Sequence, residues 1–392
     1  MGKTEKSRGE FLTQTQDVRN QGILSAWLPR WIWSTAANHD GIRREFEAGK
    51  KFSLADHKQK HKGPAVIVGA GPSLTKHLPI LKDCKIPFFV PESMASVMSY
   101  NNRKPEYITA YDGGRALLFL EKENWKNSTL LTHPAVVAPL LRWWKWKKLY
   151  YLMMHVPRVD LAKIQPNWTM NELVEYVQNQ SVGKEFFSLI NPLLFPYITT
   201  RILNAGCVAN NMIQIAHFMG YDPLFLIGCD FGYPGDISRT YYYEIPWRLP
   251  LEPRWIWKKR WKEIHPGKLG ELCRPIHISN NGIKTTEEQV EYKIALMSVY
   301  KLDKPQLIDC SAGIITELPK ADFREVVKRD GKGFEGIYRT DAEIQRVVDD
   351  YYRRIEKDKN AGNGDRKSEK VRAADNSDGR GIKQKAESAK KS

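Results

Sequence analysis

The sequence has few cysteines and no long apolar run. Its five cysteines show no CxxC spacing, and the chain contains neither a signal peptide nor an apolar stretch long enough to span a bilayer. It also contains no internal repeat. We therefore expect a reduced, cytoplasmic protein, soluble or peripheral at the inner face of a membrane. Cys207 and Cys229 fall in an expected helix and strand, where a cysteine usually packs as a small hydrophobe.

Two familiar phosphate-binding motifs are missing. The glycine-rich segment at 66–74 (VIVGAGPSL) is not followed by the Gly-Lys-Ser/Thr of a Walker A loop. Its third glycine position holds Leu74, and no ribose-binding acid closes the next strand, so the dinucleotide fingerprint is incomplete. These absences argue against a P-loop NTPase and against a hydride-transfer enzyme.

What the segment does contain predicts a strand, a tight loop and a helix. The apolar run 65–68 breaks at Gly69 and Gly71, and leucines then recur at helical spacing. Unpaired amides and the helix dipole favour an anion at such a helix start, and glycine lets a ligand approach without a Cβ clash. An equally weighted interpretation is that Gly69, Gly71 and Pro72 form only a sharp turn.

A second informative segment runs from Asn204 to Tyr233. One apolar helical face is followed by Gly220 as a helix stop and by an apolar strand at 224–227, which leads to Asp230. Ligands of open α/β sheets gather outside the carboxyl ends of strands, so Asp230 and the Gly69 loop are expected to share one crevice. The alternative is that Asp230 serves as a structural cap or ion-pair partner.

Acidic residues are too few to balance the basic ones, and the formal net charge is +16. Part of the excess lies beyond about residue 351, where large apolar residues almost disappear and a disordered tail is expected. Such a tail either binds an anionic partner or only confers solubility.

Tryptophan accompanies much of the remaining positive charge. Membrane interfaces favour this combination, since the ring lies among headgroups and the cation meets anionic lipid. Stacking on sugar rings, stacking on single-stranded nucleic acid and plain core packing are the alternatives. Core packing is at least as favoured for the middle cluster, whereas the last cluster is predicted to be a lid that binds an anionic acceptor. Ten of the twelve tryptophans form the three clusters: Trp27, Trp31 and Trp33; Trp143, Trp144 and Trp146; Trp247, Trp255, Trp257 and Trp261.

The alternation of short apolar strands with helices predicts an α/β fold, a Rossmann-like and mostly parallel sheet flanked by helices. The expected organisation is a helical aromatic leader at 1–60, a core at 61–330 with a lid insertion at about 236–275, a C-terminal helix at 331–356 and a disordered basic tail at 357–392. The expected strands are Ala65 to Val68, Ile86 to Val90, Tyr107 to Tyr111, Leu149 to Met153 and Leu224 to Ile227.

Six blocks in this order resemble the motility accessory factor (Maf) flagellin glycosyltransferases: 69–74 (GAGPSL), 105–112 (PEYITAYD), 206–210 (GCVAN), 220–230 (GYDPLFLIGCD), 280–286 (NNGIKTT) and 307–313 (LIDCSAG). The resemblance covers roughly residues 63 to 315. The wider family includes archaeal 6-hydroxymethylpterin diphosphokinases of the MptE type and is distantly similar to bacterial sialyltransferases. It implies a transferase.

Departures from the motifs of these families narrow the range of expected reactions and donors. The chain has no HGDN-like run and no paired acids of the pterin kinases, and after Asp230 it continues through 234–240 without the usual His-Ala, which leaves the acceptor side open. No DxD pair ends a strand. The resemblance implies a CMP-linked nonulosonic acid, whose single leaving phosphate protein donors can stabilise, so no cofactor is required. Mg²⁺ is expected only if the diphosphokinase alternative holds.

The candidate site residues follow from the blocks and the resemblance. Gly69, Ala70, Gly71, Pro72 and Ser73 are expected to shape a nucleotide site, with the Ser73 hydroxyl and local amides as donors, and Asp230 is expected beside them. Asp112 is assigned to ribose or sugar hydroxyls, with a helix cap as its alternative. Gly206 and Asn210 are assigned to the donor sugar.

The catalytic candidates are Tyr233 and His277. Tyr233 is assigned to the leaving phosphate, with one of the tyrosines at 241–243 as a further candidate donor. Histidine titrates at about pH 6.5, near working pH, which suits a general base. His277 precedes the 280–286 block and is preferred to His265, although a lone histidine is more often structural. No metal ligands are assigned.

Three functions remain open. The first is a glycosyltransferase with a CMP-linked donor and an anionic glycan, glycolipid or protein acceptor, in contact with a membrane surface through its Trp/Lys/Arg clusters. The second is a Mg²⁺- and ATP-dependent diphosphokinase. The third is a non-enzymatic protein that binds a lipid surface or, less favoured, nucleic acid, with affinity that falls steeply with salt.

Overall fold

The computed structural model describes residues 29–50, 52–111, 120, 124–154, 191–233, 276–279, 282–334, 342, 346 and 353. The expected lid at 236–275 and tail at 357–392 lie outside these residues, as do Asp112, His265 and the tyrosines at 241–243. The chain divides into two compact units, Met1–Tyr338 and Arg339–Ser392. The three described residues of the second unit are helical.

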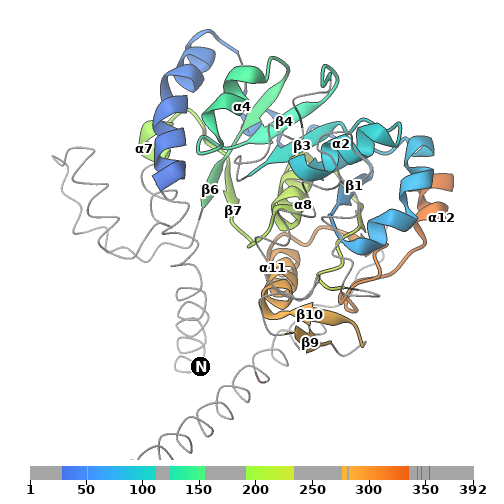
Figure 1. Ribbon diagram of the computed structural model, residues 1–392. Helices are drawn as coiled ribbons and strands as arrows, with labels where there is room; N and C mark the ends of the chain where they lie inside the picture. Colours follow the sequence, from blue (N-terminus) through green and yellow to red (C-terminus); the bar gives the residue numbers. More distant parts are fainter. Residues whose placement is uncertain are drawn as a thin grey trace, which may run out of the picture. The chain divides into compact units, whose positions relative to one another are not determined.

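The first unit is built on a seven-stranded parallel sheet, in agreement with the expected α/β fold (Figure 1). Its strand order is β11-β8-β1-β2-β3-β4-β5. The strands are β1 (Ala65–Val68), β2 (Phe88–Pro91), β3 (Tyr107–Ala110), β4 (Thr129–Thr132), β5 (Lys148–Tyr150), β8 (Leu224–Ile227) and β11 (Leu307–Asp309). The chain runs outward from β1 to β5 and then returns to the other side of β1, so the order reverses between β1 and β8. Such a reversal is where open α/β sheets hold their ligands.

Both faces of the sheet are covered. The central strands are buried along their whole length, as continuous apolar runs in parallel sheets require. On one face, alternate strand residues such as Val66 and Val68 join a core cluster with α2 (Glu92–Tyr100). On the other, α8 (Val208–Met219) contacts β1 and β2 and packs against α11 (Glu287–Asp303). Gly220 ends α8 in the left-handed conformation (φ 101°), which confirms the predicted helix stop.

Smaller elements complete the unit. β6 (Leu152–Met154) pairs in parallel with β7 (Arg201–Leu203), and β9 (Ile276–Ile278) pairs in antiparallel with β10 (Lys284–Thr286). Short helices are α4 (Ala138–Trp143), α7 (Asn191–Leu194) and α12 (Phe323–Lys328). The 3₁₀ helices are η1 (Leu54–His57), η2 (Pro72–Lys76) and η3 (Leu78–Asp83). The strand expected at Leu149–Met153 is therefore divided between β5 and β6.

A helix over residues 29–47 is tied to the β4–β5 side of the sheet. The Glu45 carboxylate accepts hydrogen bonds from the Lys148 ammonium and, at 3.0 Å, from the Tyr150 hydroxyl. The Asn38 amide donates to the carbonyls of Pro134 and Val136 at 2.8 and 2.7 Å. These contacts make the helix part of the sheet's packing.

The middle tryptophan cluster belongs to the core. Trp144 is buried, Trp143 and Trp146 pack against the same core cluster, and the three rings meet edge to face. Core packing is thus the interpretation that holds for this cluster. In contrast, Trp33 on the 29–47 helix is 61% exposed, and the cluster at 247–261 lies outside the described residues.

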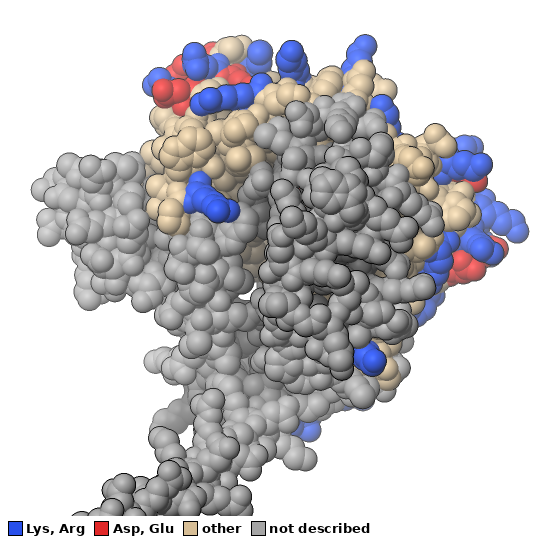
Figure 2. Space-filling model, in the orientation of Figure 1, with Lys and Arg blue, Asp and Glu red and all other residues tan. Residues whose placement is uncertain are grey.

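Lys and Arg side chains lie along the upper and right-hand margins of the surface that is coloured in Figure 2, with a few acidic side chains among them. Within the described part of the chain, no helix combines the length and the apolar content needed to cross a bilayer.

Candidate functional site

The Gly69 loop and the end of β8 touch backbone to backbone. The amides of Gly69 and Gly71 donate to the carbonyls of Ile227 and Gly228 at 2.8 and 2.7 Å. A Cβ at Gly69 would come within 2.3 Å of the Gly228 oxygen, and one at Gly71 within 2.4 Å of the Asp230 carboxylate. Glycine is required here because two loops meet at close range.

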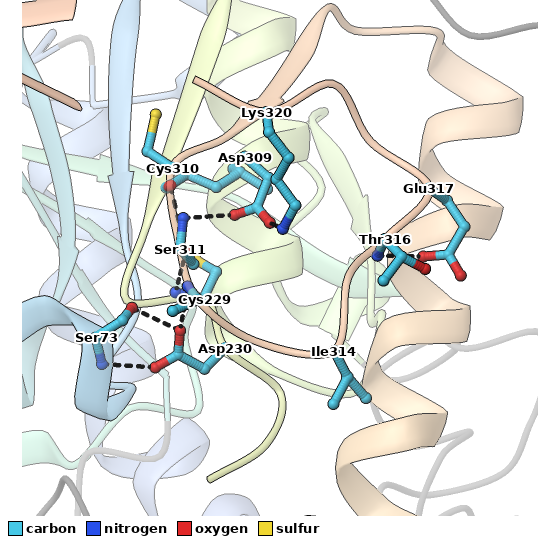
Figure 3. A network of polar contacts seen from close by, with 12 residues as sticks. Ser73, Cys229, Asp230, Asp309, Cys310, Ser311, Ile314, Thr316, Glu317 and Lys320 are labelled. Atoms are coloured by element: carbon cyan, nitrogen blue, oxygen red, sulfur yellow. Dashed lines mark hydrogen bonds and ion pairs between the residues drawn. The ribbon is translucent and has the colours of Figure 1, made fainter. Parts of the chain in front are cut away.

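The Asp230 side chain lies at this contact, beside the first residues of η2. Its Oδ2 accepts from the Ser73 amide at 2.8 Å, and its Oδ1 accepts from the Ser73 hydroxyl at 2.6 Å and the Ala312 amide at 3.1 Å (Figure 3). Burial raises the pKa of this carboxyl group, and the hydrogen bonds from Ser73 and Ala312 oppose the rise. The carboxylate fills the place where a ligand anion was expected.

This arrangement corrects part of the expectation for the loop. Asp230 and the Gly69 loop do meet, but the Ser73 hydroxyl and the amides of Gly71 and Ser73 already have protein acceptors. Pro72 has no amide hydrogen. Within the part of the loop that the structure describes, the amide of Ala70 is the one without a partner, and this residue is half-buried.

The loop that follows β11 holds Asp230 from the other side. The Ser311 hydroxyl accepts from the Cys229 amide at 2.9 Å, and the Ile314 amide donates to the Asp230 carbonyl at 2.8 Å. The Ser311 amide in turn donates to Asp309, a buried carboxylate paired with Lys320. Burial raises the pKa of Asp309, opposed by Lys320. The sequence indicated this loop only because the 307–313 block resembles the Maf family. The pattern that could have indicated a site is an acid, a serine and a glycine at the end of a strand.

A hairpin brings the two catalytic candidates to one region. The Tyr233 amide donates to the Lys284 carbonyl at 2.7 Å, and the Thr285 hydroxyl donates to the Phe231 carbonyl at 2.8 Å. Thr285 is the register partner of His277 across β9 and β10. The Tyr233 side chain is buried, while that of His277 lies outside what the structure describes.

The start of α8 carries Gly206 and Asn210. Gly206 has φ 83°, and a Cβ there would come within 2.9 Å of the Tyr292 ring on α11. The fully buried Asn210 amide donates to the carbonyls of Ala205 and Tyr292 at 2.8 and 2.9 Å. Its Oδ1 has no partner. Both residues therefore join α8 to α11, and Asn210 retains one buried acceptor.

No group of three or more His, Cys, Asp and Glu side chains in the described residues is placed to hold a metal ion. Asp230 and Asp309 are the two buried acids near the crevice, and each is engaged by protein donors. Asp112, the remaining candidate acid, directly follows the last described residue after β3.

The chain is similar to a solved structure and to a family model. The structure of a Maf glycosyltransferase from Magnetospirillum magneticum AMB-1 matches 75% of this chain and 41% of its own, at 16% identity and a TM-score of 0.43. The chain thus spans about two fifths of that protein. No curated protein matches this chain. A family model described as 6-hydroxymethylpterin diphosphokinase MptE-like matches residues 43–236. Over these residues, the chain is similar to the MptE-like family.

Proposed function

We propose that the chain is a glycosyltransferase that takes a nucleotide-activated sugar, with a CMP-linked nonulosonic acid as the donor and a polymeric or membrane-linked molecule as the acceptor. The observation that carries the proposal is the state of Asp230. Both of its oxygens accept hydrogen bonds from the protein, at a position between β1 and β8 where this fold class holds nucleotides.

A carboxylate whose two oxygens accept hydrogen bonds from Ser73 and Ala312 serves to hold the loops after β1 and β11 in place. A CMP-linked sugar leaves as a single phosphate, and fixed hydrogen-bond donors can stabilise that charge. The Ala70 amide supplies one such donor, and Tyr233 is proposed as a second. This donor class therefore suits a crevice whose two buried acids are already engaged.

The remaining roles follow from position. Gly69, Gly71 and Ser73 contact the end of β8 and Asp230, and we propose that the unpaired Asn210 oxygen accepts from the donor sugar. His277 is proposed as the general base for the acceptor hydroxyl, since it is the register partner of Thr285, whose hydroxyl donates to Phe231 in the segment that leads to Tyr233.

A diphosphokinase is the second candidate, because the matched family model carries that description. It would need ATP and Mg²⁺, and carboxylate and phosphate oxygens would hold the metal. Asp112 is the proposed carboxylate in this case. The third candidate, a non-enzymatic anion-binding protein, draws support from the net charge of +16.

Thermal shift measurements test the three candidates. The protein is heated with CMP, CDP, UDP, GDP or ATP, each with and without Mg²⁺. A bound nucleotide at 100 times its Kd adds about 2.7 kcal/mol of stability. Stabilisation by CMP without metal is the expected result. Stabilisation only by ATP together with Mg²⁺ would favour the kinase. No response to any nucleotide would favour the third candidate.

A variant pair localises the binding. Ala70→Glu places a negative charge beside the free amide and should abolish the CMP shift by repelling its phosphate. Ala36→Glu makes the same change on the exposed side of the 29–47 helix and should leave the shift intact. If both variants keep the shift, the nucleotide binds elsewhere.

A further inference from the structure

Three polar residues share one face of the sheet toward the carboxyl ends of β3, β4 and β5. Thr109 is the register partner of Leu131, and Leu131 is that of Leu149. Side chains alternate along strands, so His133 and Tyr151, two residues further on, lie on the same side as Thr109. The neighbours Ile108, Ala110, Leu130 and Tyr150 lie in the core cluster of the opposite face.

Two of these residues carry buried hydroxyls without partners. Thr109, His133 and Tyr151 are all fully buried, and neither the Thr109 Oγ1 nor the Tyr151 hydroxyl makes a hydrogen bond. Buried hydroxyls are almost always paired, because leaving one unpaired costs its full desolvation energy. Two such groups on one face of the sheet indicate that a partner is missing from the free protein.

His133 separates the two hydroxyls and is uncharged. Its Nε2 donates to the Tyr111 carbonyl at 2.7 Å, and its Nδ1 accepts from the Ala135 amide at 3.2 Å. Burial lowers the pKa of His133 to about 4, so the ring is neutral at working pH. Ring centroids lie 5.5 Å away for Tyr111 and 6.2 Å away for Tyr151.

The charges around the cluster indicate the chemistry of the missing partner. Burial raises the pKa of the Tyr151 hydroxyl, and the negative charge of Glu92 raises it further, so Tyr151 stays protonated. The two hydroxyls and the neutral His133 ring carry no positive charge with which to pair a phosphate, whereas a hydroxyl or amide group of a ligand can both donate to them and accept from them.

We propose that Thr109, His133 and Tyr151 form a subsite for the uncharged hydroxyl or amide groups of the donor sugar. This inference rests on the proposed glycosyltransferase function and adds to it a location for the sugar. At a strand spacing of about 4.8 Å, β3 and β4 lie roughly 10 and 14 Å from β1. The sugar therefore lies across the carboxyl edge of the sheet from the Gly69 loop.

Two variants remove the hydroxyls with little change of shape: Tyr151→Phe and Thr109→Val. Binding to each is measured by calorimetry with two probes, CMP and the unreactive CMP-3-fluoro-N-acetylneuraminic acid. The sugar should add affinity in the wild type, and each variant should lose about tenfold of that added affinity while CMP binds unchanged. Unchanged sugar affinity, or an equal loss for both probes, would overturn the subsite.

Ligand-free stability gives a second, independent readout. If the hydroxyls are unpaired in the free protein, the Tm of each variant should equal or exceed that of the wild type. Tyr107→Phe is the matched control, because the Tyr107 hydroxyl is bonded to that of Tyr221 at 2.9 Å. This control should lower the Tm and leave the sugar affinity intact.

The two readouts separate the possible failures. A Tm several degrees lower in Tyr151→Phe would show that the hydroxyl has a lasting partner, such as an ordered water, and would overturn the subsite whatever binds. If the wild type binds neither probe, the proposed donor class is wrong. The Tm comparison then decides alone whether the two hydroxyls await a ligand.

Discussion

Gly313 lies against the backbone of Asp230 and shows how tightly the crevice is assembled. A Cβ at this position would come within 1.8 Å of the Asp230 carbonyl oxygen and 2.2 Å of its Cα. Since both contacts are to backbone, the loops must separate to admit a methyl group. We expect Gly313→Ala to lower the free energy of unfolding by about 3 kcal/mol or more, measured by urea denaturation.

The matched control is Gly41→Ala on the 29–47 helix, where an added Cβ meets nothing within 4 Å. Alanine is the better helix former, so this variant should be as stable as the wild type or up to about 1 kcal/mol more stable. Equal stability of the two alanine variants would show that the 309–314 loop can shift at little cost.

His133 makes the stability depend on pH with a definite sign. Its pKa is lowered to about 4 by burial, whereas an unfolded histidine titrates at about 6.5. Between these values the unfolded chain binds more protons, so stability is complete above pH 6.5 and falls as the pH drops toward 4. His133 alone should account for a loss of about 3 kcal/mol.

Urea denaturation at several pH values between 7.5 and 4 measures this loss in the wild type and in His133→Gln, which keeps an amide donor but does not titrate. The buried carboxyls of Asp230 and Asp309 have raised pKa values and act in the opposite direction, so the difference between the two proteins is the quantity to compare. Parallel curves would mean that His133 does not titrate as described.

At the scale of elements, apolar runs predicted strands well and predicted helix type poorly. β1 and β8 begin and end where the sequence placed them, because buried parallel strands are short apolar runs with glycine beyond them. β4 (TLLT) escaped notice because four residues with polar ends carry little periodicity. Leu74, Leu78 and Leu81 are all buried as their spacing predicted, but Pro72 and Pro79 interrupt the segment, and it forms two 3₁₀ helices.

The site shows the same division. The rule for carboxyl ends of strands predicted that Asp230 meets the Gly69 loop. It could not predict that the Ser73 hydroxyl bonds to Asp230. A protein carboxylate and a ligand anion both satisfy a serine hydroxyl, and only the three-dimensional approach of η2 to the end of β8 decides between the two. The unpaired state of the Thr109 and Tyr151 hydroxyls is likewise unpredictable from sequence, because it depends on no other polar group among the described residues coming within hydrogen-bond distance.

The β9–β10 hairpin is expected to fix the loop that carries Tyr233. Thr285→Val keeps the side-chain shape but removes the hydrogen bond to the Phe231 carbonyl, which leaves a buried acceptor unpaired. The Tyr233 amide, bonded to Lys284, should then exchange with deuterium about tenfold faster, equivalent to a loss of about 1.4 kcal/mol in local stability.

Thr132→Val provides the control, since its hydroxyl donates to the Ala110 carbonyl within the sheet, away from the hairpin. Exchange at Tyr233 should be unchanged in this variant. If Thr285→Val also leaves that exchange unchanged, the backbone pairing alone holds the loop.

At the scale of the whole molecule, the charge and the fold both reside mainly in the first unit. Residues 339–392 carry 15 basic and 11 acidic residues, so they supply only a small part of the net charge of +16. Every strand of the sheet also lies before Arg339. A chain that ends at Tyr338 therefore retains what the proposed function uses.

We expect the chain ending at Tyr338 to unfold with the Tm of the full chain in calorimetry, because it keeps Phe334. The Phe334 ring meets the Phe225 ring of β8 edge to face at 5.3 Å, and its carbonyl accepts from the Gln306 amide beside β11. A chain ending at Asp330 loses these contacts and should unfold at a lower temperature. If ending the chain at Tyr338 lowers the Tm as much, residues 339–392 stabilise the first unit directly, and the boundary between the two units is not where stability divides.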